Sequence, residues 1–184
     1  MARSIRSLAL FRSREDYETF FLLLKKTREK YPFAIHSYCL MTTHFHLLVS
    51  TFDTEIWKIM KYLMYSYAMY FNQRYGTRGH VFDSRYVSCL IEDERYFLEV
   101  SRYIHLNPVK AGMVHGAADY EYSSYPSILA GKNSEILEPG DILNRFRGDQ
   151  TAQYRIFVES MASHQENEAM IQREMMEDEK WLPW

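Results

Sequence analysis

The sequence predicts an α+β fold, in which helices pack on an antiparallel sheet. Residues 14–30 and 54–75 carry apolar side chains at helical spacing. Between them, residues 33–40 and 44–51 are rich in β-branched and aromatic residues, and the short turn 41–43 joins them. Such a pair of runs is typical of a β-hairpin. We expect the helices to lie on one face of this sheet.

The first helix, over residues 14–30, carries its own start and stop signals. Ser13 is a favoured N-cap, and the acid three residues later, Asp16, gives nearly a capping box. Pro32 breaks the chain soon after the last turn.

The second helix, over residues 54–75, ends at Gly76, a residue common just after helices. Residues 86–91 are then predicted as a third strand and residues 93–106 as a third helix. Pro108 ends that helix, because the residue before a proline disfavours helical backbone. Residues 112–125 are expected to be irregular.

The chain divides into a body over residues 1–130 and an acidic, mainly helical C-terminal extension over residues 131–184. The body holds 16 basic and 13 acidic side chains, whereas the extension holds 6 and 11. Residues 131–140 predict a linker, and residues 141–162 and 164–180 predict amphipathic helices. A mildly basic body permits binding of a polyanion without requiring it.

Composition narrows the class of protein. The chain has 184 residues, of which 47% are hydrophobic and 25% charged, as in a globular domain. Its apolar runs are too short to span a membrane, and no secretory leader opens it. Cys39 and Cys89 are isolated, which suits a reducing compartment. We therefore expect a cytoplasmic protein without membrane partners.

Two histidines in the second strand of the hairpin form the first candidate site. Side chains alternate along a strand, so His44 and His46 project from one face while Phe45 points into the core. Imidazoles about 7 Å apart along a strand can converge on one metal ion. The alternative is a pair of exposed polar residues on a half-buried strand.

A tyrosine and an asparagine near the end of the third helix form the second candidate site. Tyr103 and Asn107 are four residues apart and share a helix face. A tyrosine beside a divalent metal can attack phosphorus in a phosphodiester. Asn107 can supply an oxygen ligand to magnesium or manganese. The alternative is that Tyr103 packs and Asn107 only ends the helix.

These motifs, in this order, resemble the one-tyrosine HUH transposases of the insertion-sequence type, and within them the REP-associated tyrosine transposases. The resemblance covers about residues 11–160. It is carried by these stretches: Tyr38–Val49, Tyr70–Gly76, Gly79–Phe82, Arg85–Tyr86, Arg102–Val114 and Ser123–Tyr125.

The resemblance implies a ferredoxin-like or RRM-like fold and an enzyme for DNA transposition. Members cleave and rejoin single-stranded, hairpin-forming DNA through a 5′-phosphotyrosine intermediate. Carried over, Tyr103 is the nucleophile, and His44, His46 and Asn107 hold Mg²⁺ or Mn²⁺. His105 is a poorer ligand because it points about 200° away from Tyr103 on a helix. The resemblance leaves open a homodimer.

Cations and aromatic rings are candidates to hold the DNA strand. The candidate DNA contacts are Arg74, Arg78, His80, Arg85, Arg102 and Lys110, with Tyr75 and Tyr86 as stacking platforms. For each of them, a solvated surface charge or a packed ring is the alternative.

The start of the chain departs from the family pattern. Members begin with a Tyr-His-Val strand followed by Arg-Gly, which is absent here. Residues 4–10 are a candidate for a shortened substitute strand, and without one the sheet would have an exposed edge. Thr42-Thr43 replaces the usual Pro-Asn before the first ligand, and the acidic extension is unfavourable for DNA affinity.

Three functions therefore remain open from the sequence. The first is a metal-dependent DNA strand transferase, and the second is a degenerate or domesticated protein that binds a nucleic-acid hairpin without cutting it. The third is an interaction protein whose aromatic faces and acidic extension bind other chains. Covalent DNA adducts would indicate the first function, and hairpin binding without cleavage would indicate the second. The absence of binding to any single strand would indicate the third.

We expect His44→Ala or His46→Ala to lower the affinity for manganese, because each removes one imidazole ligand. Isothermal titration calorimetry on the variants and the unchanged protein measures this directly. Equal affinities would contradict a metal site on this strand face.

Overall fold

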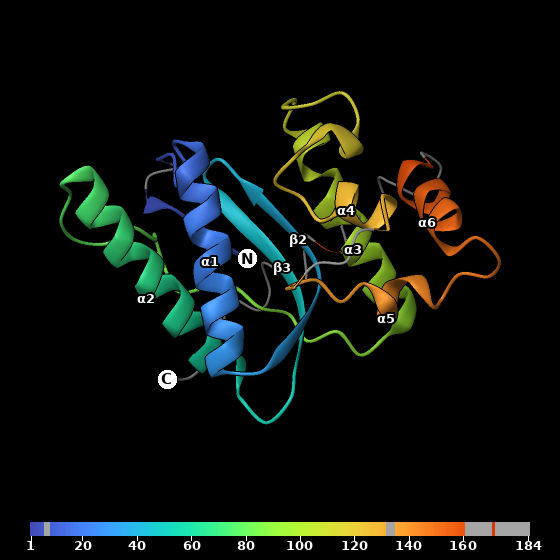
Figure 1. Ribbon diagram of the computed structural model, residues 1–184, viewed down its shortest axis with the longest axis horizontal. Coiled ribbons are helices and arrows are strands. Elements are labelled where there is room, and N and C mark those ends of the chain that lie inside the picture. The colour runs from blue at the N-terminus through green and yellow to red at the C-terminus, as the bar shows by residue number, and fades with distance from the viewer. Residues whose placement is uncertain (6–7, 132–134, 161–170, 172–184) are drawn as a thin grey trace.

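The computed structural model describes residues 1–5, 8–131, 135–160 and 171 (Figure 1). Its elements, in chain order, are β1 (Ala2–Arg3), α1 (Arg14–Lys30), β2 (Phe33–Met41), β3 (His44–Thr51), α2 (Ile56–Tyr75), α3 (Glu94–Lys110), the 3₁₀ turn η2 (Ala117–Asp119), α4 (Tyr125–Leu129), α5 (Gly140–Leu143) and α6 (Gln150–Glu159). No described helix is both long enough and apolar enough to cross a bilayer.

The sheet has three antiparallel strands in the order β1-β3-β2. The predicted hairpin is confirmed: β2 and β3 pair with Met41 opposite His44, and Thr42-Thr43 forms the turn between them. The register places Cys39 opposite His46 and Leu40 opposite Phe45. Successive pairs therefore face opposite sides of the sheet.

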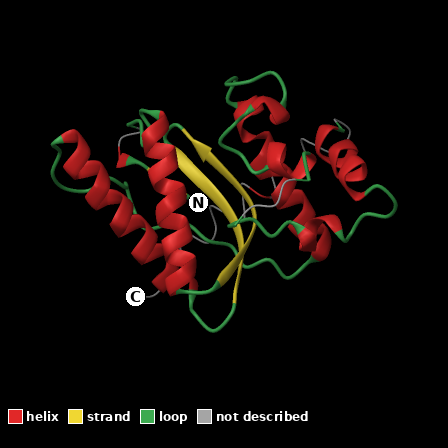
Figure 2. Cartoon of the chain, viewed as in Figure 1, coloured by secondary structure: helices red, strands yellow, loops and turns green. Residues whose placement is uncertain are grey.

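Helices cover both faces of this sheet (Figures 1 and 2). On one face, the ring of Phe45 packs 4.8 Å from that of Phe20 in α1, measured between centroids. On the other face, His46 lies against Tyr103 of α3. The expectation of helices on a single face is wrong, because α3 also has an apolar stripe to bury, including Val100 and Ile104.

Both edges of the sheet are covered. β1 pairs with β3 at the outer edge, and beyond it Ser4 forms a bridge to Phe82. On the opposite edge, Ser123 bridges to Cys39 of β2 and the Glu138 amide donates to Ile35. The substitute strand lies at Ala2–Arg3, ahead of the predicted residues 4–10, so the edge of β3 beside His44 is paired rather than exposed.

Three predicted elements need correction. Residues 86–91 form no strand: β1 is only two residues long, and Val87 exchanges two hydrogen bonds with Met1, just ahead of it. α3 continues past Asn107 to Lys110 with Pro108 inside its last turn, at the cost of the one helical hydrogen bond that a proline nitrogen cannot donate. The predicted helix 141–162 is interrupted between α5 and α6.

Gly148 explains that interruption. Its φ of +71° is a left-handed conformation that ends regular helix. Asp149 then caps α6 by accepting a hydrogen bond from the Ala152 amide. The predicted helix 164–180 lies outside the described residues, apart from Ile171. The predicted boundary between residues 130 and 131 stays a prediction.

A buried carboxylate joins the start of α1 to the end of α2. Asp16 has no exposed surface and accepts hydrogen bonds from the amides of Arg12 and Ser13 and from the hydroxyls of Tyr70 and Tyr75. The predicted capping function of Asp16 is thus confirmed, and the same group also fixes the second helix. This contact holds the two helices against each other.

We expect Asp16→Ala to lower the free energy of unfolding by about 3 kcal/mol, because it leaves buried donors without an acceptor. Urea denaturation followed by circular dichroism measures the change. Asp53→Ala, at an exposed acid in the loop after β3, is the matched control and should cost no more than about 0.5 kcal/mol. Equal stability of the two variants would contradict this assignment.

Candidate functional site

The structure brings three of the predicted site residues together on the α3 face of the sheet. The imidazole rings of His44 and His46 lie 5.0 Å apart between centroids and nearly perpendicular. The ring of Tyr103 lies 5.8 Å from that of His46, again nearly perpendicular. The pleat of β3 presents both histidines to α3, and packing of α3 on β2 and β3 brings the tyrosine over them.

His46 is buried in an environment that leaves its nitrogens unpaired. Only 2% of the residue is exposed, and neither Nδ1 nor Nε2 has a hydrogen-bond partner in the part of the chain that the structure describes. His44 is partly exposed, and its Nδ1 lies 3.0 Å from the Thr43 hydroxyl. A buried imidazole without partners is unfavourable by itself, which makes His46 a candidate for an external ligand.

Both rings are kept neutral by their surroundings. Burial lowers the pKa of His44 to about 4, with a further contribution from the positive charges of Arg3 and the N-terminus. Burial and then the neighbouring His44 hold the pKa of His46 well below its usual value. Neutral imidazoles have lone pairs that can coordinate a metal ion.

These residues fit a divalent cation in part. The unpaired nitrogens of His46 and the adjacent His44 provide nitrogen donors. Among the residues that the structure describes, no group of three or more His, Cys, Asp or Glu side chains comes together to add a carboxylate. A third protein ligand would have to be of another type, such as an amide oxygen.

Asn107 and Lys110 lie on the same part of α3 as Tyr103. The Asn107 side-chain nitrogen donates to the Tyr103 carbonyl at 2.7 Å, so the Asn107 oxygen is the atom left for a metal. The Lys110 ammonium lies 4.7 Å from the centroid of the Tyr103 ring. Lys110, predicted only as a DNA contact, is therefore next to the candidate nucleophile.

Arg102 does not face the site. It is 2% exposed, forms an ion pair with Glu99, and lies 4.7 Å from the centroid of the Phe157 ring in α6. The prediction that Arg102 contacts DNA is corrected, because its guanidinium is enclosed between α3 and α6. Sequence reasoning missed this pairing because α6 comes from the predicted extension.

His105 is likewise turned away from Tyr103, as the helical spacing predicts. It is fully buried, and its two nitrogens lie 2.8 Å from the hydroxyls of Ser124 and Tyr154. Burial lowers the pKa of His105 to about 3. The network ties the back of α3 to α6, so the described part of the acidic extension supports the helix that carries Tyr103.

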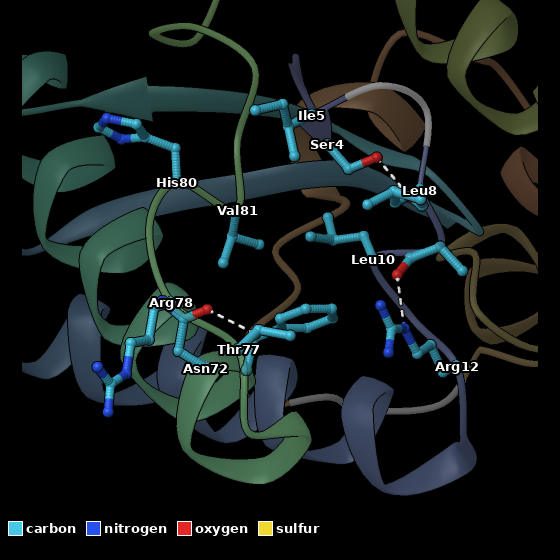
Figure 3. Close-up of a pocket in the computed structure, with 12 residues that line it drawn as sticks. Ser4, Ile5, Leu8, Leu10, Arg12, Asn72, Thr77, Arg78, His80 and Val81 are labelled. Atoms are coloured by element: carbon cyan, nitrogen blue, oxygen red, sulfur yellow. Dashed lines mark hydrogen bonds between the residues drawn. The ribbon is translucent and has the colours of Figure 1, made fainter.

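The remaining predicted DNA contacts are spread over other parts of the fold. Arg74 pairs with Glu15 and Asp16. Arg78 and His80 line a cavity of about 210 Å³ between the N-terminal segment and the end of α2 (Figure 3). Arg85 is exposed and lies between Asp83 and Val87, whose amides donate to the carbonyls of Arg3 and Met1. Arg85 is therefore in a segment beside β1, the strand that pairs with β3 at His44.

The predicted stacking platforms are partly covered. The guanidinium of Arg12 lies 4.4 Å from the centroid of the Tyr75 ring, whose hydroxyl donates to Asp16. Tyr86 is only partly exposed. The ring of Tyr75 is thus covered in part by Arg12, whereas stacking of a base on Tyr86 stays a prediction.

Arg3 is a neighbour of the site that the sequence did not indicate. It is exposed, and in the register of the sheet it is the residue of β1 directly opposite His44 of β3. A strand of two residues is too short to produce a recognisable pattern of alternation. No sequence signal could have placed this cation beside the histidines.

The chain matches known proteins along most of its length. Residues 6–107 match the family described as "Transposase IS200 like". A protein of Haemophilus influenzae named REP-associated tyrosine transposase is 30% identical over 139 residues, covering 64% of this chain and 78% of that protein. The solved structure of a REP-associated tyrosine transposase bound to a REP hairpin superposes with a TM-score of 0.61 at 18% identity, covering 74% of this chain and 81% of the other.

The chain belongs to the IS200-like transposase family. The relatives that it matches are REP-associated tyrosine transposases, so the resemblance predicted from the motifs is confirmed. The structural match also confirms the predicted α+β fold. The functions of individual site residues stay predictions.

Acidification should destabilise the protein through its buried histidines. An unfolded histidine binds a proton near pH 6.5, whereas folded His105 does so only near its lowered pKa of about 3. Above pH 6.5, His105 is neutral in both the folded and the unfolded state and causes no loss of stability. Below pH 6.5, the free energy of unfolding falls by about 1.4 kcal/mol per pH unit, because only the unfolded state binds the proton.

We expect His105→Gln to reduce the slope of unfolding free energy against pH by about 1.4 kcal/mol per unit between pH 6 and 4.5. Urea denaturation at several pH values measures the slope, which separates this effect from any loss at pH 7. An unchanged slope would show that His105 is not a buried neutral group.

Proposed function

We propose that this protein is a tyrosine transposase that cleaves and rejoins single-stranded DNA next to a hairpin. One observation carries the proposal: the Tyr103 ring lies 5.8 Å from that of His46, a buried histidine whose nitrogens have no described partner. A nucleophile and an unsatisfied ligand group from different elements are thereby adjacent. This is the arrangement that metal-assisted phosphoryl transfer requires.

The reaction is a transesterification at phosphorus. The Tyr103 oxygen forms a bond to phosphorus, the bond from phosphorus to the 3′ oxygen breaks, and the phenol proton passes to the leaving 3′-hydroxyl. The 5′-phosphotyrosine linkage is itself a phosphodiester, and it replaces the one that breaks in the DNA. Attack by a 3′-hydroxyl can therefore reverse the step without an external energy source. Lys110, beside the ring, supplies positive charge near the phosphate.

His44, His46 and the Asn107 oxygen are the residues that would hold a divalent cation, Mg²⁺ or Mn²⁺. When bound, the cation supplies charge that polarises the scissile phosphate. The lowered pKa of both histidines supports this function, because the imidazoles need no deprotonation near neutral pH.

Hairpin DNA is the proposed partner. The relative of known structure is described bound to a REP hairpin. Arg78 and Arg85 are exposed cations that would contact the strand beyond the site, together with the exposed His80, and contacts of the two arginines with phosphates would weaken as salt rises. Hairpin binding without cleavage is the second candidate, favoured by the two-residue length of β1 beside the histidines.

We expect Tyr103→Phe to abolish covalent protein–DNA adducts while hairpin binding and thermal stability stay within about twofold and about 2 °C of the unchanged protein. End-labelled hairpin oligonucleotides incubated with manganese and separated on a denaturing gel report the adduct. Tyr65→Phe, at an exposed tyrosine of α2, is the matched control and should form adducts normally.

An adduct that persists in Tyr103→Phe would exclude Tyr103 as the nucleophile. Tight hairpin binding by the unchanged protein, without any adduct under varied metals and substrates, would favour the second candidate. No salt-dependent binding to any single strand would contradict both.

A further inference from the structure

Arg3 is a cation at the candidate site that the proposed chemistry leaves without a function. It is the cross-strand partner of His44, so the two side chains leave the sheet on the same face, towards α3. Arg3 is exposed, and its guanidinium forms no hydrogen bond or ion pair with the residues that the structure describes. Such a group is available to a ligand arriving from solvent.

Positive charges act on the histidine pair. Arg3 and the N-terminus both lower the pKa of the two rings. Burial lowers the pKa of the N-terminal amine to about 5, and the amine donates to the Val87 carbonyl. At neutral pH, Arg3 is therefore the cation that β1 contributes, and Lys110 adds a second beside Tyr103.

A divalent cation at the histidine pair would add to this positive charge. In metal centres built with carboxylates, the protein itself balances the charge of the ion. Here the described residues provide no carboxylate cluster. A phosphodiester seated between Arg3, Lys110 and the histidines would supply balancing negative charge.

Resting on the proposed function, we propose that Arg3 binds the scissile phosphate and makes metal uptake depend on DNA. The guanidinium fork matches two phosphate oxygens and anchors the strand at the edge of the sheet. Without DNA, the charge of Arg3 repels the metal; with DNA bound, the phosphate offsets this repulsion. Because such coupling is reciprocal, the metal also strengthens DNA binding.

This arrangement predicts opposite effects from one substitution. Arg3→Gln removes a repulsive charge from the free protein, so manganese should bind about fivefold more tightly without DNA. The same change removes a phosphate contact, so hairpin affinity measured in EDTA should fall about tenfold or more. A residue that only supports the fold would weaken both.

The experiment compares the full chain with Arg3→Gln, Arg3→Lys and Arg95→Gln. Calorimetry with manganese alone gives the metal affinity, fluorescence anisotropy with a labelled hairpin in EDTA gives the DNA affinity, and the adduct gel gives cleavage. Arg3→Lys keeps the charge and should keep the weak metal affinity while losing part of the DNA affinity. Arg95→Gln, at an exposed arginine in the first turn of α3, should change neither affinity by more than about twofold.

The two binding measurements test Arg3 even if the proposed function fails. If the unchanged protein forms no adduct but Arg3→Gln shifts both affinities as expected, the reaction is wrong and the phosphate site stands. If the unchanged protein forms adducts and Arg3→Gln matches Arg95→Gln in both affinities, the inference about Arg3 is overturned. Loss of both affinities in Arg3→Gln, together with a lowered melting temperature, would also overturn it in favour of a structural function.

Discussion

The alternation of side chains along β3 is the constraint on which the rest of the structure depends. Phe45 enters the core under α1, and the residues on either side of it, His44 and His46, therefore emerge on the opposite face. A shift of one residue in register would exchange the two faces and bury both imidazoles in an aromatic core. The two-residue turn and the pairing of Met41 with His44 fix the register.

Covering the histidine face with α3 buries His46, and this has an energetic cost. An imidazole with neither nitrogen bonded loses the hydrogen bonds that it makes with water. The surrounding structure offsets this loss through contacts on the far side of α3, where His105 bonds to Tyr154 and Arg102 pairs with Glu99. A site held in this way is stabilised from behind by residues with no contact to the reacting atoms.

The C-terminal extension therefore supports α3, a function that its acidic composition does not indicate. Its negative charge is unfavourable for DNA affinity, yet α6 presents Tyr154 and Phe157 to α3. The contact buries Arg102, which the sequence alone placed among the DNA contacts. Basic residues of α3 are thus divided between the support of the helix, through Arg102, and the site, through Lys110 beside Tyr103.

Elements with local signals follow from the amino-acid sequence alone. The capping residue Asp16, the apolar stripes of α1 and α2, and the β-hairpin are contained in short stretches, and each of these elements forms as predicted. The ordered motifs also identified the family, because spacing along a chain survives as sequence information. The placement of His44 and His46 on one strand face follows from the same local rule.

Contacts between residues that are distant in sequence depend on the packing of the folded chain. Residues 86–91 have strand-like composition but form no strand in the described structure, and Arg102 has the charge of a DNA contact but is enclosed by α6. Arg3 lies beside His44 through a strand too short to leave a pattern. Pairing of edges and packing of helices depend on residues far apart along the chain, so propensity and periodicity carry no information about them.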